Sequence, residues 1–190
     1  MRLAFILFDD MTMLDFSGFH NAVTWLKKRG LVEDMTWDYC ATKEEITDDR
    51  GMRVKVDLVL PHLGHYDVVF LPGGMGTRRL VSDASFIDWL RTAEEAAYKA
   101  SVCTGAVLLG AAGLLTGKRA TTNPNAIELL VSYCGTAVRE RYVQDGRVFT
   151  GGGITASVDL GLFFIESIWG EAVAADIQQA MDYPYYKSLA

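Results

Sequence analysis

The sequence predicts an α/β sandwich, in which helices cover both faces of a mainly parallel sheet. Residues 3–8 and 67–72 form short, nearly continuous apolar runs, as is typical of parallel strands buried on both faces. A third strand-like run ends near Ser101-Val102, and each run leads into a loop that contains small or acidic residues. Ligands of open α/β sheets bind at the carboxyl ends of the strands, so we expect these three loops to converge on one pocket.

The other segments alternate between helical and strand patterns, as this fold requires. In the first half we expect a helix that ends near Lys27–Gly30, a strand over 35–42, a half-exposed strand over 54–60, and an amphipathic helix over 82–97 capped by Ser82. In the second half we expect a helix after Cys103, a helix from Asn123-Pro124 to about Tyr133, a hairpin of strands 138–143 and 147–150, a helix over 157–169, and a short helix after Gly170.

The composition predicts one soluble domain over residues 1–190. Half of the residues are hydrophobic, which is enough for a full core. The net charge of −6 is spread along the chain without a cluster of Lys and Arg, so no nucleic-acid partner is expected. The chain shows neither an apolar run of membrane-spanning length nor a signal-peptide pattern, which predicts no membrane association and a cytoplasmic location.

Cys103 is the strongest candidate for a reactive residue. Small neighbours, Ser101, Gly105 and Ala106, allow a sharp strand-to-helix turn that would expose its side chain at the edge of the sheet. The N-terminus of the following helix would favour the thiolate, which is the reactive form. The alternative is a packed core cysteine, and this is the favoured interpretation of the other two cysteines, Cys40 and Cys134. An odd number of widely spaced cysteines predicts neither a disulfide framework nor a metal cluster.

No cofactor or metal is expected from the remaining motifs. The glycines that begin at Gly73 make a poor dinucleotide fingerprint, because Arg79 stands at the third glycine position. His62 and His65 could share a metal, but no third ligand is evident and exposed loop histidines are the simpler interpretation. Asp15 alone would be read as a helix cap or a solvated turn residue; together with Cys103 it becomes a candidate proton carrier.

Several motifs resemble the ThiJ/PfpI superfamily in order and spacing, over nearly the full length. They are Leu14–Gly18, Leu71–Gly74, Val102–Gly105, Leu109–Thr122 and Gly152–Asp159. An aspartate near the first strand and a cysteine followed by Thr-Gly resemble the isonitrile hydratase branch, whose signature is shared by the amidotransferase-like domains of certain transcription regulators. Those regulators carry an added helix-turn-helix region, for which this chain leaves no space.

The resemblance implies a flavodoxin-like sandwich and a homodimer with a pocket at the subunit interface. It implies that Cys103 is the nucleophile, Asp15 the carboxylate beside it, and the backbone N–H groups of Gly74 and Thr104 an anion-stabilising pair, so that Thr104 counts among the catalytic residues. Candidates for the pocket wall are Gly73, His20 and Asn123. Thr104 and Asn123 stand where related sequences have histidine, so a Cys-His dyad is not expected.

Two classes of function follow from these residues. The first is an enzyme, a lyase that adds water to a small isonitrile and gives an N-substituted formamide through Cys103 and Asp15. The second is a redox or ligand sensor without enzymatic activity, in which the same thiol is oxidised reversibly. A glyoxalase or deglycase activity on small carbonyl compounds is a further alternative within the enzyme class. The hydratase and the sensor differ at Asp15: a hydratase requires a proton shuttle, whereas a sensor needs only a group that stabilises the oxidised sulfur.

Overall fold

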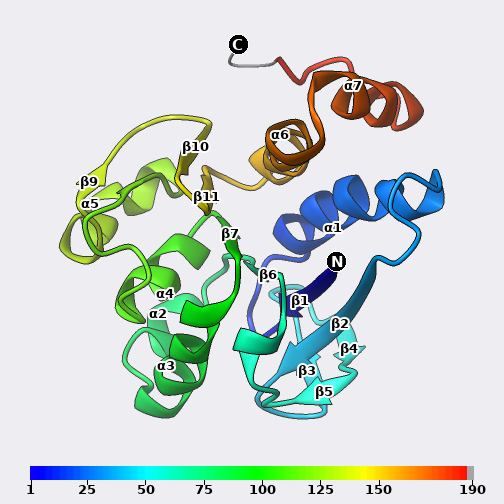
Figure 1. Ribbon diagram of the computed structural model, residues 1–190. Helices are drawn as coiled ribbons and strands as arrows, with labels where there is room; N and C mark the ends of the chain where they lie inside the picture. The colour runs from blue at the N-terminus through cyan, green and yellow to red at the C-terminus, as the bar shows by residue number, and fades with distance from the viewer. Residues whose placement is uncertain (188–190) are drawn as a thin grey trace.

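The computed structural model describes residues 1–187 and confirms the predicted sandwich, with a flavodoxin-like arrangement of helices around a mainly parallel sheet (Figure 1). Neighbouring strands of the seven-stranded sheet are parallel, except that β10 is antiparallel to β11. In sheet order the strands are β10 (Tyr142–Asp145), β11 (Val148–Gly151), β7 (Tyr98–Val102), β6 (Val68–Leu71), β1 (Arg2–Ile6), β2 (Thr36–Ala41) and β5 (Leu58–Val59).

Helices cover both faces of this sheet, and two small sheets lie outside it (Figure 1). One face carries α1 (Met13–Lys28), α6 (Ala156–Trp169) and α7 (Glu171–Ala180). The other carries α2 (Thr77–Leu80), α3 (Ala84–Arg91), α4 (Gly105–Ala111) and α5 (Ile127–Leu130). The small sheets pair β3 (Glu45–Thr47) with β4 (Arg53–Lys55), and β8 (Arg119–Ala120) with β9 (Thr136–Ala137). Short 3₁₀ turns are η1 (Leu63–His65), η2 (Thr92–Glu95), η3 (Pro124–Ala126) and η4 (Val131–Tyr133).

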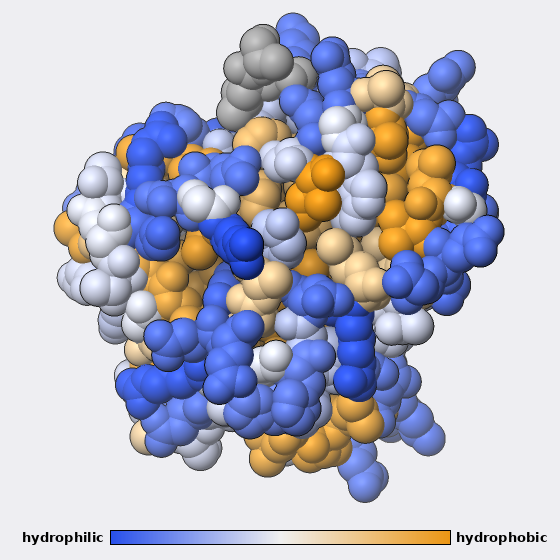
Figure 2. Space-filling view, in the orientation of Figure 1, coloured by the Kyte–Doolittle hydropathy of each residue, from blue (hydrophilic) through white to orange (hydrophobic). Residues whose placement is uncertain are grey.

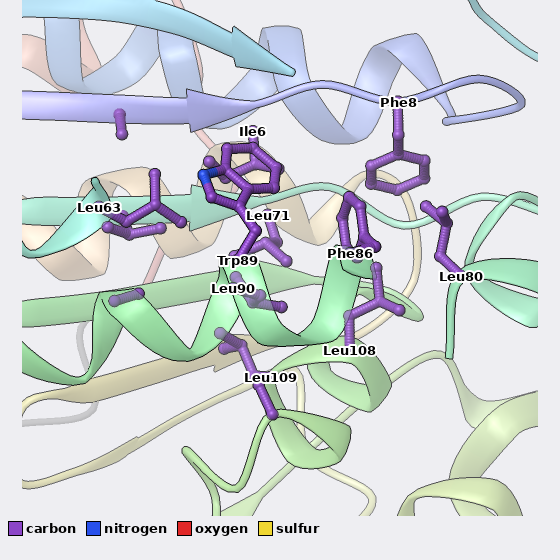
Figure 3. Close-up of a cluster of buried hydrophobic side chains, with 14 of the residues drawn as sticks. Ile6, Phe8, Leu63, Leu71, Leu80, Phe86, Trp89, Leu90, Leu108 and Leu109 are labelled. Atoms are coloured by element: carbon purple, nitrogen blue, oxygen red, sulfur yellow. The ribbon is translucent and has the colours of Figure 1, made fainter. Parts of the chain in front are cut away.

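The apolar strands supply two hydrophobic cores, one on each face of the sheet. Successive side chains of a strand point to opposite faces, so Ile6 and Leu71 join one core while Phe5 and Phe70 join the other. The first core lies against α3 and α4 (Figure 3). In the second core, Phe70 stacks on Phe19 of α1 with ring centroids 4.3 Å apart. The near-continuous hydrophobicity of these strands therefore reflects burial on both sides.

Two sequence predictions on the 45–97 segment hold only in part. The strand expected over 54–60 is divided: β4 turns back on β3 after Gly51, whereas β5 joins the main sheet beside β2. Between these two pairings the N–H of Asp57 donates to the carbonyl oxygen of Tyr39, and the Asp57 carboxylate accepts the N–H of Tyr39, which breaks the run. The helix expected over 82–97 begins after Asp83, whose side chain accepts the N–H of Phe86, and tightens into η2 at residue 92.

The later elements lie close to their predicted positions, with shorter or shifted bounds. The helix expected from Asn123 to Tyr133 is an α-helical turn between η3 and η4. The expected hairpin is formed by β10 and β11, and residues 138–141 stay outside it. Among the described residues, no helix combines the length and apolar character that a membrane span requires. The face shown in Figure 2 is largely hydrophilic, with separate hydrophobic areas between the polar side chains.

Helix α1 packs unusually closely on α6, and this contact holds Asp15 in place. Gly161 lies where a Cβ atom would approach the Cβ of Ala22 to 2.6 Å. A side chain at position 161 would therefore push the two helices apart. Asp15 lies in the first turn of α1, so the close packing of α1 on α6 also sets the position of its carboxyl group.

We predict that Gly161→Leu lowers the free energy of unfolding by at least about 1–3 kcal/mol, since overpacked cores lose stability on this scale. The measurement is urea unfolding followed by circular dichroism. The matched control is Ala172→Leu, which adds one carbon atom fewer at an exposed position of α7 and should change stability by no more than about 0.5 kcal/mol. Equal effects of the two substitutions would contradict the importance of the α1–α6 contact.

Candidate active site

Cys103 lies on the sharp turn between β7 and α4, in the left-handed conformation with φ of 55°. This conformation costs a non-glycine residue of the order of 1 kcal/mol, so the surroundings must enforce it. The N–H of Cys103 donates to the carbonyl oxygens of Gly151 and Gly152 at 3.0 and 2.7 Å. Its own carbonyl accepts the hydroxyl of Thr122 at 2.6 Å. Cys103 is therefore held by its backbone, and its side chain lines a pocket.

The loops that follow β1, β6 and β7 meet at this turn, as the sequence predicts. The N–H of Thr12 donates to the carbonyl of Gly73 at 2.8 Å, and Met11 forms an antiparallel bridge with Gly74. Gly73 lies against the elbow so closely that a Cβ atom there would come within 2.6 Å of Cys103 Cβ and 2.9 Å of Asp15 Oδ2. Because position 73 is a glycine, the carboxyl of Asp15 on α1 can lie close to Cys103 on the turn between β7 and α4.

Asp15 is fully buried beside Cys103. Its Oδ2 accepts the N–H of Gly73 at 2.9 Å, while Oδ1 has no hydrogen-bond partner within the described part of the chain. Burial raises the pKa of Asp15 to about 7, and the charge of Asp49 raises it further, against the opposing effects of the Gly73 N–H and the Cys103 thiol. A carboxyl with this pKa exists in both protonation states near neutral pH, which suits proton transfer.

The environment of the Cys103 thiol differs from the one expected at a helix N-terminus. Burial and the charge of Asp15 raise the pKa of Cys103 above its ordinary value, while the N–H of Thr104 and the side chains of Asn123 and Thr104 act in the opposite direction. The side chain is only 7% exposed, and α4 has only seven residues. The loss of hydration and the charge of Asp15 therefore raise the pKa of the Cys103 thiol by more than the N-terminus of α4 lowers it. A thiol in this setting needs a base to become a nucleophile.

The groups expected to stabilise an anion lie next to the thiol. The N–H of Gly74 points at Thr104 and donates to its Oγ1 at 3.1 Å, and the N–H of Thr104 interacts with the sulfur of Cys103. The hydroxyl of Thr104 in turn lies 3.2 Å from the carbonyl oxygen of Gly74. A change of the Thr104 side-chain rotamer would move Oγ1 and free the Gly74 N–H for a substrate atom, so the anion-stabilising role remains a prediction.

A pocket of about 220 Å³ opens at Cys103. It contains Asn123, one of the predicted wall residues, whose Oδ1 accepts the N–H of Asn125 at 3.0 Å. The loops after β1, β6 and β7 all contribute to its wall, which is formed by Thr12, Asp49, Gly74, Met75, Arg78, Cys103, Thr104, Asn123, Asn125, Ala126 and Ile154. The pocket is smaller than the roughly 300–1,000 Å³ of sites for drug-sized ligands, which indicates a small ligand.

His20 lies away from this pocket, which differs from the expectation that it forms part of the pocket wall. Its ring packs among Phe5, Phe16 and Trp37 at centroid distances of 5.0, 5.1 and 5.8 Å. Its Nε2 shares a hydrogen bond of 2.9 Å with the hydroxyl of Tyr39, and burial lowers the pKa of His20. Five residues beyond Asp15 on a helix, its side chain points toward β2 and the aromatic cluster.

Two charged residues of the pocket, Asp49 and Arg78, escaped the sequence analysis. Asp49 follows β3 in a turn whose acidic residues looked like ordinary turn formers, and Arg78 follows the glycine loop in a short helix. Neither position carries a local pattern that marks a ligand site. Groups of three or more metal-ligating side chains are absent from residues 1–187, and His62 and His65 lie together in and beside η1.

The other two cysteines match the interpretation as packed thiols. Cys40 is fully buried in β2, where burial raises the pKa of its thiol to about 11. Cys134 is partly exposed beyond η4, and burial also raises its pKa. None of the three cysteines forms a disulfide in the described chain.

The fold and the site together define an α/β sandwich with a strained cysteine elbow and a buried carboxyl beside it. The model of the DJ-1/PfpI family matches residues 1–167, and the chain belongs to this family. The family membership agrees with the resemblance inferred from the motifs around Asp15, Gly73, Cys103 and Gly152.

Similar proteins include both an enzyme and a regulator. An isonitrile hydratase from Pseudomonas putida is 34% identical over 184 residues, which cover 96% of this chain and 78% of that protein. The HTH-type transcriptional regulator CdhR from Pseudomonas aeruginosa is 35% identical over 132 residues, which cover 68% of this chain but only 39% of the regulator. The crystal structure of a ThiJ/PfpI family protein from Pseudomonas syringae is 28% identical, with a TM-score of 0.85 over all of this chain and 78% of that one.

The raised pKa of Asp15 predicts a pH-dependent cost to stability. Between about pH 4 and pH 7 the native state holds a proton on Asp15 that the unfolded chain releases, so the stability contributed by this site falls as pH rises through that window. Asp15→Asn removes the buried charge, and we expect it to raise the free energy of unfolding at pH 8 by about 2–4 kcal/mol but by little at pH 4.

Chemical unfolding of both proteins across pH 4–8 measures this difference. Asp88→Asn, which removes an exposed carboxylate from α3, is the control and should give no comparable gain at pH 8. A variant at position 15 that is less stable than the original chain at pH 8 would show that Asp15 is a structural anchor and not a strained, buried acid.

Proposed function

We propose that this protein is an enzyme of the isonitrile hydratase type, which adds water to a small isonitrile and releases an N-substituted formamide. The observation that carries the proposal is a buried carboxyl with a pKa of about 7, placed across Gly73 from a thiol that lines a small pocket. The similarity to the Pseudomonas putida isonitrile hydratase over nearly the whole chain supports it.

In the first half of the reaction, Asp15 takes the proton from the thiol of Cys103. The sulfur forms a bond with the terminal carbon of the isonitrile, and the proton passes from Asp15 to the same carbon. The product is a thioimidate in which the carbon is bonded to sulfur and hydrogen and doubly bonded to nitrogen. The N–H groups of Gly74 and Thr104 would stabilise negative charge that develops on the sulfur and the substrate.

In the second half, water adds to the carbon–nitrogen double bond. Its oxygen bonds to the carbon and one of its protons reaches the nitrogen through Asp15. The carbon–sulfur bond of the resulting adduct then breaks, and the sulfur recovers a proton from the hydroxyl group as the formamide carbonyl forms. One water is consumed, and both Cys103 and Asp15 return to their initial states.

The protonation of the pair favours the enzyme over the sensor. A redox sensor gains from a thiolate that is present before the oxidant arrives, whereas burial and Asp15 both raise the pKa of the Cys103 thiol. A base that activates the thiol only during the reaction fits a catalytic cycle better. A glyoxalase or deglycase is less well supported, because Asp15 stands in place of a glutamate and Thr104 in place of a histidine.

A homodimer with the pocket at the subunit interface, inside the cytoplasm, belongs to the same proposal. Exposed apolar side chains support an interface at the mouth of the pocket, where Met75 is 62% and Ile154 is 38% exposed. Leu14, one residue before Asp15, is 46% exposed. Sedimentation velocity of the purified chain tests the association, and a monomer at every concentration would contradict it.

The hydratase proposal predicts that Cys103→Ala abolishes isonitrile hydration. Asp15→Asn, although nearly isosteric, should reduce kcat/KM by about 10²–10⁴-fold, the usual contribution of general acid–base catalysis. Formation of the formamide from alkyl and aryl isonitriles, measured by chromatography, gives both numbers. Cys134→Ala is the control for loss of a thiol outside the pocket.

Methylglyoxal serves as a parallel substrate in the same assay. Turnover of methylglyoxal without turnover of any isonitrile would replace the hydratase with the glyoxalase alternative. A chain that is reversibly oxidised at Cys103 but turns over neither substrate would support the sensor.

We expect the Asp15 carboxyl to increase the rate of turnover but to decrease the rate at which Cys103 is alkylated. Asp15→Asn removes the negative charge that raises the pKa of Cys103, so we expect iodoacetamide to modify this thiol faster in the variant at pH 8. Mass spectrometry of time-resolved labelling measures the rate, with Cys134 in the same chain as internal reference. Slower labelling of Cys103 in the variant would show that Asp15 does not hold the thiol protonated.

A further inference from the structure

Arg78 contributes a positive charge to the wall of the pocket. It follows the Gly74–Gly76 loop on α2, and its exposed side chain lines the same cavity as Cys103. It forms no ion pair with any residue in the described chain, whereas the adjacent Arg79 pairs with Asp10 at 3.3 Å. The two neighbouring arginines are therefore differently placed: the guanidinium of Arg79 is engaged with protein, and that of Arg78 is available to a ligand.

The acidic side chain that shares the pocket wall with Arg78 is already paired. Asp49, the other charged residue of the wall, accepts the hydroxyl of Thr12 at 3.0 Å through Oδ2 and pairs with Arg50 at 2.8 Å through Oδ1. Asp15 lies fully buried beneath the thiol and is partly protonated at neutral pH. The charge left without a partner at the wall is consequently positive.

The rest of the wall fits a short apolar spacer between the thiol and this cation. Met75, Ala126 and Ile154 contribute apolar surface, and the amide of Asn125 adds a polar group. A ligand whose reactive end meets Cys103 would thus place its other end among groups that favour an anion. Guanidinium groups bind carboxylates through paired N–H donors, which makes Arg78 the element of the pocket best suited to select one.

We propose that Arg78 is a specificity-determining residue and that the substrates are small isonitriles that carry a carboxylate. The substrate class rests on the proposed hydratase activity, but the recognition of an anion at Arg78 does not. The pocket of about 220 Å³ limits the ligand to a short molecule, for example one of the size of isocyanoacetate.

Alkylating agents test anion recognition without any catalysis. Iodoacetate and iodoacetamide have nearly the same shape and differ in charge, and 3-bromopropionate with its amide provides a longer pair. We expect the anion-to-amide rate ratio at Cys103 to exceed the ratio at Cys134 of the same chain. It should fall about tenfold in Arg78→Gln, the effect of losing one charge-assisted hydrogen bond, and should also fall with added salt.

Arg79→Gln is the matched control, because it removes the neighbouring arginine that pairs with Asp10. It should leave the rate ratio at Cys103 as in the original chain. The proposal is overturned if neither chain length shows an anion preference at Cys103, or if Arg79→Gln lowers the ratio as much as Arg78→Gln.

Turnover then tests the substrate class. We expect kcat/KM for isocyanoacetate to exceed that for isocyanoacetamide, and the ratio of the two to fall about tenfold in Arg78→Gln. An anion preference in alkylation combined with no turnover of either isonitrile would retain the anion site and reject the hydratase. Turnover of both isonitriles with no preference, together with no preference in alkylation, would retain the hydratase and reject the role of Arg78.

Discussion

The burial of the Asp15 carboxyl against the Cys103 elbow is the interaction on which the rest of the site depends. A carboxylate without water at this position is unfavourable, and this cost is what raises its pKa into the neutral range. The single N–H of Gly73 offsets only part of the cost, because the second carboxyl oxygen has no partner among residues 1–187. The chain thus keeps an acid at this position that lowers its stability when it ionises.

The fold supplies the rigidity that keeps this unfavourable pair together. Cys103 is held in a left-handed conformation by backbone hydrogen bonds from the loop after β11, and Asp15 is held by the close packing of α1 on α6. The backbone of Gly73 lies against both Cys103 and the carboxyl of Asp15. A family of such proteins can change chemistry by altering the side chains around the thiol while this framework stays the same, which accords with an enzyme and a regulator among the similar chains.

The titratable and charged side chains at the pocket fall into two sets, one buried and one exposed. The carboxyl of Asp15 and the thiol of Cys103 are buried, whereas Asp49 and Arg78 face the space that a ligand would enter. Asp49 is paired with Arg50, so the charged group that the pocket offers to a ligand is the guanidinium of Arg78. Proton transfer and ligand selection can therefore vary independently.

The sequence by itself determined the sandwich, the loops that meet at the pocket and the candidate pair of Asp15 and Cys103. These features rest on local patterns: apolar runs specify buried strands, and small residues specify the sharp turn. The tertiary structure alone decided the division of residues 54–60 between two sheets, the aromatic surroundings of His20 and the entry of Arg78 into the pocket. It also decided that the pKa of Cys103 rises, because hydration and neighbouring charge depend on residues that are distant in the chain and become neighbours only when it folds.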